Sequence, residues 1–172
     1  MGHRARYVNK TALRRLCRRL TPDNALVIET AIETGLRVSD VLHITKNRLI
    51  PPNKITFIAR KTGKKGEKTI NNDLFSRLLR NGNKKFVFPS VVDGRKTRTR
   101  QAVWSNMRRA YSGDGRAPSP HSARQAYAVA LARQKGIDAV RRELQHTHTD
   151  TTISYALADV LQARQKTDDV DD

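Results

Sequence analysis

The strand-forming residues of this 172-residue chain are concentrated in one stretch near its middle. Residues 55–59 alternate in hydrophobicity and are β-prone, residues 61–66 carry two glycines, and residues 68–70 suit a returning strand. Residues 49–50 supply a further short strand. This stretch therefore predicts one small antiparallel sheet built around a hairpin.

Helical signals lie on both sides of that stretch. Thr21-Pro22-Asp23 combines an N-cap residue with a proline and an acid in the first turn, and Gly35 suits the end of the same helix. Further helices are expected over residues 10–20, 38–44, 102–111, 119–136 and 137–144, after Asn72, and from about residue 149 past Leu161. The predicted fold class is mainly α with a small antiparallel β-sheet (α+β).

The charge of the chain is strongly unbalanced, with 34 Lys and Arg against 16 Asp and Glu and a formal net charge of +18. An excess of this size predicts a polyanionic partner, and nucleic acid is favoured over a membrane or a heparin-like ligand. No apolar run is long enough to cross a membrane, and the N-terminus lacks the apolar stretch of a signal peptide. We therefore expect a cytoplasmic, DNA-associated protein, with a solvated basic surface as the simpler alternative.

Length and cysteine content limit the architecture further. The chain is long enough for one domain with its own core, which we expect over residues 1–165, and residues 166–172 are expected to form an acidic, disordered tail. Cys17 is the only cysteine, so an intrachain disulfide and a Cys-based zinc site are excluded.

Two basic residues are predicted at turns from which they can reach a phosphate. Arg37 follows Gly35 at the start of a short helix, and Asp40 can brace its guanidinium. Lys61 lies where the strand over residues 55–59 meets the hairpin turn, so it can contact a DNA backbone or donate a proton to a leaving oxygen. Either cation can also be an ordinary surface residue or a general phosphate contact.

His121 and Arg124 form a second candidate pair. Their spacing places both on one face in the first turn of the helix that follows Pro120. An imidazole, a guanidinium and a helix N-terminus together can bind an anion. The alternative is a histidine with a capping or packing role and a solvated arginine.

His146 and Tyr155 are separated by a stretch long enough for a turn and part of a helix, so both can face one point. Tyr155 can also be a core residue between aliphatic neighbours. A metal site at His146 and His148 is disfavoured because no cysteine is near and Asp150 is the one carboxylate close behind. No metal is therefore predicted.

Five features occur in order along the chain: the segments TGLRVSD, ARKTGKK, HSAR and LQHTH, and the tyrosine that follows. Together they resemble the tyrosine recombinase (phage integrase) family, and the resemblance extends from about residue 10 to about residue 160. The resemblance implies a catalytic set that is matched here by Arg37, Lys61, His121, Arg124, His146 and Tyr155. Gln145 stands where the family usually has glycine, and Gln125 where it often has histidine, so local packing is expected to differ.

The resemblance implies a site-specific recombinase or integrase that breaks and rejoins DNA strands through a covalent 3′-phosphotyrosyl intermediate, with no cofactor, metal or ATP. It implies double-stranded DNA as partner, a DNA-assembled homo-oligomer such as a tetramer, and a mobile genetic element as context. Family members usually carry a separate N-terminal DNA-binding domain. None is expected here before Arg37, so an accessory DNA-binding protein joins the expected partners.

Basic residues outside the catalytic set are expected to bind the DNA backbone. They lie around the hairpin turn and in the loop before residue 101, and they are Arg60, Lys64, Lys65, Lys96, Arg98 and Arg100. Two alternatives to a recombinase are a catalytically silent or accessory DNA-binding protein of the same fold and a basic nucleoid or RNA-binding protein. The first retains the fold without the chemistry, whereas the second explains the charge but not the ordered motifs.

Overall fold

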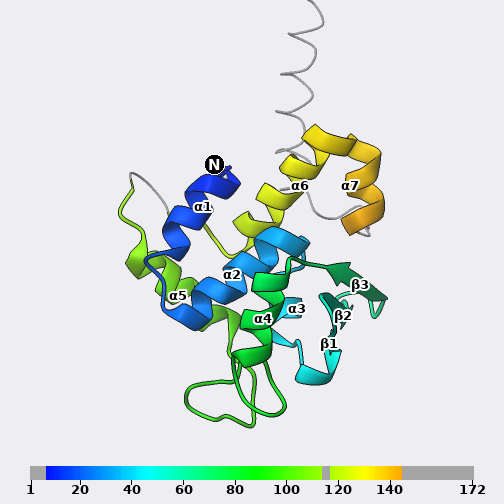
Figure 1. Cartoon of the computed structure of the whole chain (residues 1–172). Helices are drawn as coiled ribbons and strands as arrows, with labels where there is room; N and C mark the ends of the chain where they lie inside the picture. The colour runs from blue at the N-terminus through cyan, green and yellow to red at the C-terminus, as the bar shows by residue number, and fades with distance from the viewer. Residues whose placement is uncertain (1–6, 114–116, 145–172) are drawn as a thin grey trace, which may run out of the picture.

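The computed structural model describes residues 7–113 and 117–144 (Figure 1). Along the chain the elements are α1 (Lys10–Cys17), α2 (Pro22–Thr34), α3 (Val38–Leu42), the 3-10 helix η1 (Lys46–Arg48), β1 (Leu49–Ile50), β2 (Lys54–Ile58), β3 (Lys65–Thr69), α4 (Asn72–Arg80), α5 (Arg100–Ala110), α6 (His121–Lys135) and α7 (Ile137–Leu144). This architecture confirms the predicted fold class. The helix predicted from about residue 149 and the acidic tail lie outside the described residues.

The sheet has the order β1-β2-β3 with antiparallel pairing throughout. Ile55 in the central strand pairs with Leu49 on one side and with Lys68 on the other. Ile55 and Phe57 are buried, whereas their neighbours along β2 are not. One face of the sheet therefore packs on the protein and the other faces solvent, as is common for antiparallel sheets. The predicted hairpin is confirmed.

Helix α2 lies at the centre of the molecule and packs against α1, α3 and α6. Its residues Val27, Ile28, Ala31 and Ile32 have no exposed surface. Figure 1 shows α6 and α7 at the top of this helix group, the sheet at the right and the long connection between α4 and α5 at the bottom. Within residues 7–113 and 117–144 no helix has the length and hydropathy needed to cross a membrane.

The turn after α2 requires glycine. Gly35 adopts a left-handed conformation with φ of 68°, and its N–H donates to the carbonyl of Ala31. A Cβ atom at this position would lie 2.4 Å from the ring of Tyr127 and 2.8 Å from Leu144, which is closer than non-bonded carbon atoms approach. The turn between α2 and α3 therefore packs directly against α6 and the end of α7.

Helix α5 begins earlier than predicted. Thr99 is its N-cap residue, and the Thr99 hydroxyl accepts a hydrogen bond from the N–H of Ala102 at 3.1 Å. The first helical residue is consequently Arg100 rather than Ala102. This shift matters because it places Arg100 and Gln101 on the first turn of a helix instead of in a loop.

The start of α2 also differs in one detail from the expectation. Thr21 occupies the predicted N-cap position but makes no side-chain capping bond. Its hydroxyl donates instead to Asn106 of α5 at 3.2 Å, and Asn24 donates to the same amide oxygen at 2.9 Å. These bonds connect the start of α2 to α5, so Thr21 contributes to packing between helices rather than to the cap.

Candidate active site

The first turns of two helices and the N-cap residue of a third border one cavity of about 410 Å³. Arg37 is the N-cap residue of α3. His121 begins α6, and Arg124 lies one turn further along the same helix. The structure therefore brings three of the six predicted catalytic residues to one cavity, although Arg37 is far from the other two in sequence.

The wall of this cavity carries positive charge. Arg37, Arg100 and Arg124 contribute guanidinium groups and His121 contributes an imidazole, and no Asp or Glu is among the described residues that line it. The N-termini of α5 and α6 add the positive ends of their helix dipoles. A cavity with this composition suits a phosphate or another anion.

Arg124 is the most deeply buried of these cations, with 4% of its surface exposed. Its Nη1 donates to the carbonyl of Gly35 at 2.5 Å, and its Nη2 donates to the carbonyl of Leu144 at 3.0 Å. One guanidinium thus holds the end of α2, the start of α6 and the end of α7 together. Because Gly35 lies just before Arg37, the same bonds fix the approach of Arg37 to the cavity.

The hairpin turn that carries Lys61 has a defined backbone. The N–H of Ala59 donates to the carbonyl of Lys64 at 2.8 Å. The carbonyl of Ala59 in turn accepts from the N–H groups of Thr62 at 3.1 Å and Gly63 at 2.7 Å. Gly63 adopts a φ of 68°, which closes the turn and which glycine adopts without strain. The backbone that carries Lys61 is therefore held in one conformation.

Asp40 connects this turn to α3. Its carboxylate is buried and accepts a hydrogen bond from the backbone N–H of Arg60 at 3.0 Å. The sequence places Asp40 one helical turn after Arg37 and predicts a bracing role for it. The bond to Arg60 extends that role to the hairpin, because it fixes the position of Lys61 relative to the helix that begins after Arg37.

A smaller gap of about 20 Å³ lies between the hairpin and two of the arginines. Thr62, Arg37 and Arg124 are part of its wall. Lys61 is exposed, precedes Thr62 in the turn and does not line the larger cavity. The structure thus places the Lys61 turn next to the cluster of Arg37, His121 and Arg124 but outside the cavity.

A group of three side chains joins β3, α6 and α7 next to this gap. Lys68 donates to the carbonyl of Glu143 at 3.3 Å and forms an ion pair with its carboxylate. The hydroxyl of Tyr127 donates to the same carboxylate at 3.1 Å. The hydrogen bond from Lys68 lowers the pKa of Glu143, and burial raises the pKa of Tyr127. The three side chains connect the hairpin to the helix that ends at Leu144.

The cations predicted to bind the DNA backbone differ in exposure. Those that are exposed are Arg60, Lys64, Lys65, Lys96 and Arg100. Arg100 also lines the large cavity, so it lies next to the candidate catalytic residues. The others lie around the hairpin turn and in the connection before α5.

Arg98 is the exception. Its side chain is 10% exposed, its Nη2 pairs with Asp23 at 2.5 Å and its Nη1 donates to Asn24 at 3.2 Å. These contacts fasten the connection between α4 and α5 to the start of α2. DNA binding by Arg98 stays a prediction, and this geometry disfavours it because little of the guanidinium faces solvent.

His146 and Tyr155 lie outside the described residues, so their roles stay predictions. The cavity also includes residues that sequence reasoning missed, among them Gln101 and Trp104 on the first turns of α5. The available signal was Thr99, whose type and position mark it as the N-cap of a helix that starts at Arg100.

A family model described as "Phage integrase family" matches residues 8–161 of this chain. The chain belongs to the phage integrase family. A comparison with curated protein sequences finds no match. The family match covers both the described cavity residues and the predicted positions His146 and Tyr155.

Solved structures of integrases and recombinases share the fold of this family member. The catalytic domain of bacteriophage HP1 integrase has a TM-score of 0.64 and 22% identity over 87% of this chain and 86% of that chain. A lambda integrase dimer bound to a COC′ core site has a TM-score of 0.69 and 19% identity over 91% of this chain and 49% of that one. XerH recombinase in a post-cleavage complex with difH has a TM-score of 0.69 and 14% identity over 98% of this chain and 54% of that chain. The chain thus spans about half the length of the lambda integrase and XerH chains.

Proposed function

We propose that this member of the phage integrase family is a site-specific tyrosine recombinase, which breaks and rejoins DNA strands through a covalent 3′-phosphotyrosyl intermediate. The observation that carries the proposal is the cavity wall, where Arg37, Arg124 and His121 meet and the described lining residues include no carboxylate. A phosphodiester gains negative charge at its oxygens as a nucleophile attacks. Donors aimed at those oxygens therefore stabilise the transition state more than the ground state.

Arg37 and Arg124 are proposed to bind the two non-bridging oxygens of the scissile phosphate. Guanidinium groups present planar donors that match phosphate oxygens in pairs. Arg124 is oriented by the carbonyls of Gly35 and Leu144 before any substrate arrives. A preorganised donor of this kind requires no rearrangement when charge develops.

Tyr155 is proposed as the nucleophile. Its oxygen attacks phosphorus, the bond from phosphorus to the 5′-oxygen breaks, and the products are a 3′-phosphotyrosyl ester and a 5′-hydroxyl. A free phenol has a pKa of about 10, so its proton needs an acceptor, for which we propose His121. Lys61 is proposed to protonate the leaving 5′-oxygen, and His146 to donate to the phosphate.

The reverse reaction rejoins the strands. A 5′-hydroxyl attacks the phosphotyrosyl ester, the bond to Tyr155 breaks, and the tyrosine oxygen regains a proton. The ester has nearly the same energy as the phosphodiester it replaces, so no ATP is required. This balance suits an enzyme that exchanges strands rather than one that degrades DNA.

Duplex DNA is the proposed substrate, and an oligomer assembled on DNA is the proposed active form. The chain has a net charge of +18. Lambda integrase has been described as a dimer bound to a core site and as a tetramer bound to a Holliday junction. An accessory DNA-binding protein and a cytoplasmic, DNA-associated location remain parts of this proposal.

The test is a search for a covalent adduct on a denaturing gel after incubation with supercoiled plasmid in EDTA. We expect the wild type to form the adduct and to relax the plasmid, and Tyr155→Phe to bind DNA without forming the adduct. Tyr111→Phe is the matched control, because Tyr111 packs on the hydrophobic core next to α5, and it should behave as the wild type.

Three results would contradict the proposal in different ways. An adduct formed by Tyr155→Phe would refute the nucleophile assignment. A strict requirement for a divalent metal would indicate a nuclease. The wild type could also bind DNA and give neither adduct nor relaxation. If the same result is found with DNA that contains the end junctions of the mobile genetic element, it would favour the accessory DNA-binding protein of the same fold.

A further inference from the structure

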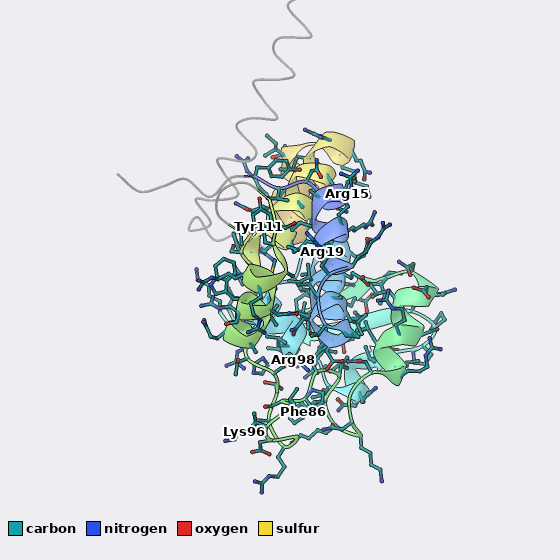
Figure 2. All side chains as sticks on the ribbon, turned by 90° about the vertical axis from the view of Figure 1, so that its left-hand side faces the viewer. Arg15, Arg19, Phe86, Lys96, Arg98 and Tyr111 are labelled. Carbon is teal, nitrogen blue, oxygen red and sulfur yellow. The ribbon has the colours of Figure 1, made fainter. Side chains whose placement is uncertain are left out.

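The connection between α4 and α5 contains a projecting loop, residues 88–98, which we call the finger. Its two sides pair through hydrogen bonds from the N–H of Arg98 to the carbonyl of Phe88 and from the N–H of Ser90 to the carbonyl of Lys96, both at 2.8 Å. Phe88 is fully buried and anchors the finger in the core. Figure 2 shows Lys96 at the lower end of the molecule, with Arg98 above it.

The tip of the finger, residues 91–95, is held in one shape. The hydroxyl oxygen of Ser90 accepts hydrogen bonds from the N–H groups of Val92 at 3.3 Å and Asp93 at 3.4 Å. The carbonyl of Gly94 accepts from the side-chain amide of Asn83 at 2.8 Å. The tip is therefore ordered before any partner binds, which reduces the entropy lost on binding.

Two apolar side chains occupy this tip. Val91 is 84% exposed and Val92 is 97% exposed. No other large apolar side chain in the described ranges is more than 44% exposed. A single exposed apolar residue is ordinary, but two adjacent valines on an ordered projection form a surface suited to a partner.

Two exposed cations follow the valines in the finger. The side chains of Arg95 and Lys96 are 93% and 79% exposed. Asp93 is the one acidic residue of the finger, and it pairs with both cations. The finger therefore combines an apolar end with net positive charge, which matches a polyanion that also has apolar groups.

The base of the finger adjoins the candidate active site. Arg98 pairs with Asp23, and the hydroxyl of Thr97 lies 3.4 Å from Nε2 of His43 after α3. Arg100, two residues after the end of the finger, lines the cavity of about 410 Å³. A duplex with its phosphate in that cavity would therefore pass close to the finger.

The shape of the finger suits one groove of DNA. Its sides form a two-stranded ribbon, joined also by an antiparallel bridge between Pro89 and Thr97. The major groove is about 12 Å wide and admits such a ribbon, and the apolar group exposed there is the C5-methyl of thymine. A membrane surface would supply negative charge but no groove for a narrow ribbon.

We propose that the finger enters the major groove beside the scissile phosphate and reads thymine through Val91 and Val92, while Arg95 and Lys96 bind the flanking phosphates. The inference rests on the proposed function for its duplex substrate. It adds to that function a specificity-determining contact on an element separate from the catalytic residues.

The experiment compares two short duplexes of one A·T-rich sequence, one with thymine and one with uracil, which lacks the C5-methyl group. We expect the wild-type chain to bind the thymine duplex roughly ten-fold more tightly, as burial of about two methyl groups implies. V91T/V92T keeps the branched shape but replaces a methyl with a hydroxyl at each position. Its thymine-to-uracil affinity ratio should fall to roughly three-fold, because each threonine keeps one of the two methyl groups of valine.

R95A/K96A is the matched control at the same tip. It should bind both duplexes more weakly, keep the wild-type thymine-to-uracil ratio, and reduce the slope of log affinity against log salt by roughly 1.8. Both double variants should keep the wild-type unfolding temperature, because all four side chains are exposed.

Equal binding of the two duplexes by the wild type would overturn the proposal. So would a wild-type ratio retained by V91T/V92T, or a loss of self-association in that variant with unchanged DNA affinity, which would make the tip a protein contact. The adduct assay with Tyr155→Phe is a separate readout, so failure of the thymine contact and failure of the recombinase proposal give different results.

Discussion

Arg124 combines two tasks that a lysine could not perform together. Its guanidinium bonds to the carbonyls of Gly35 and Leu144 and also lines the cavity. Arg124→Lys keeps the charge but has a single nitrogen, so one buried carbonyl loses its partner. We expect strand cleavage to fall at least about 100-fold and the free energy of unfolding to fall by about 1–3 kcal/mol. Single-turnover adduct formation and urea unfolding measure the two effects.

Arg108→Lys is the control for this substitution, because Arg108 is an exposed residue of α5. Its free energy of unfolding and its rate of cleavage should both match those of the wild type. A wild-type cleavage rate in Arg124→Lys would exclude Arg124 from the proposed phosphate contacts.

Single residues could be predicted from the sequence where a local motif carries them. Arg37 follows a helix-ending glycine, and His121 and Arg124 follow a helix-starting proline, so their places in the fold are read from neighbouring residues. Arg98 shows the limit of this reasoning. A basic loop predicts DNA binding, but its pairing with Asp23, 75 residues away in the sequence, depends on the tertiary fold.

Between elements, the ion pair of Lys68 and Glu143 connects the hairpin to α7. Glu143→Gln removes the charge and keeps the size of the side chain. Because the Glu143 side chain is 43% exposed, we expect the free energy of unfolding at neutral pH to fall by about 1 kcal/mol or less. The pKa of Glu143 is lowered in the folded protein. The ion pair therefore makes its full contribution to the free energy of unfolding above the pKa of unfolded glutamate, about 4.3, and this contribution is lost as the pH falls through the pKa of folded Glu143. Urea unfolding of both proteins from pH 7 to acid should therefore show the difference shrinking.

Asp138→Asn provides the control for the pH experiment. Asp138 also belongs to α7, but its ion pair with Arg141 joins two exposed side chains of the same helix. Such pairs contribute little to stability, so the variant should unfold like the wild type at neutral pH. A difference between Glu143→Gln and wild type that persists unchanged into acid would show that the ion pair is not its cause.

Element types could be predicted more fully than element contacts. The hairpin and the helices α2 and α6 follow from alternation, a proline near the start and a glycine at the end. The predicted start of α5 at residue 102 is too late because Thr99 caps the helix, and the places of Gln101 and Trp104 at the cavity depend on that earlier start. The group of Lys68, Glu143 and Tyr127 had no local signal at all, since its members lie on three elements that meet in the folded chain.

For the whole molecule, the net charge of +18 and the arrangement of cations lead to a prediction about salt. Five cations predicted to bind the DNA backbone are exposed: Arg60, Lys64, Lys65, Lys96 and Arg100. If each neutralises one phosphate, these five cations should together contribute roughly −4.5 to the slope of log affinity against log salt, and Lys64→Ala should make the slope less steep by about 0.9. Lys54→Ala should leave it unchanged, because Lys54 begins β2 and lies at the end of the hairpin opposite the turn. Fluorescence titrations with a short duplex at several salt concentrations measure the slopes.

A flat salt response of the wild type would exclude backbone phosphates as the main contact. Equal slopes for Lys64→Ala and wild type would remove the hairpin turn from the DNA-binding surface.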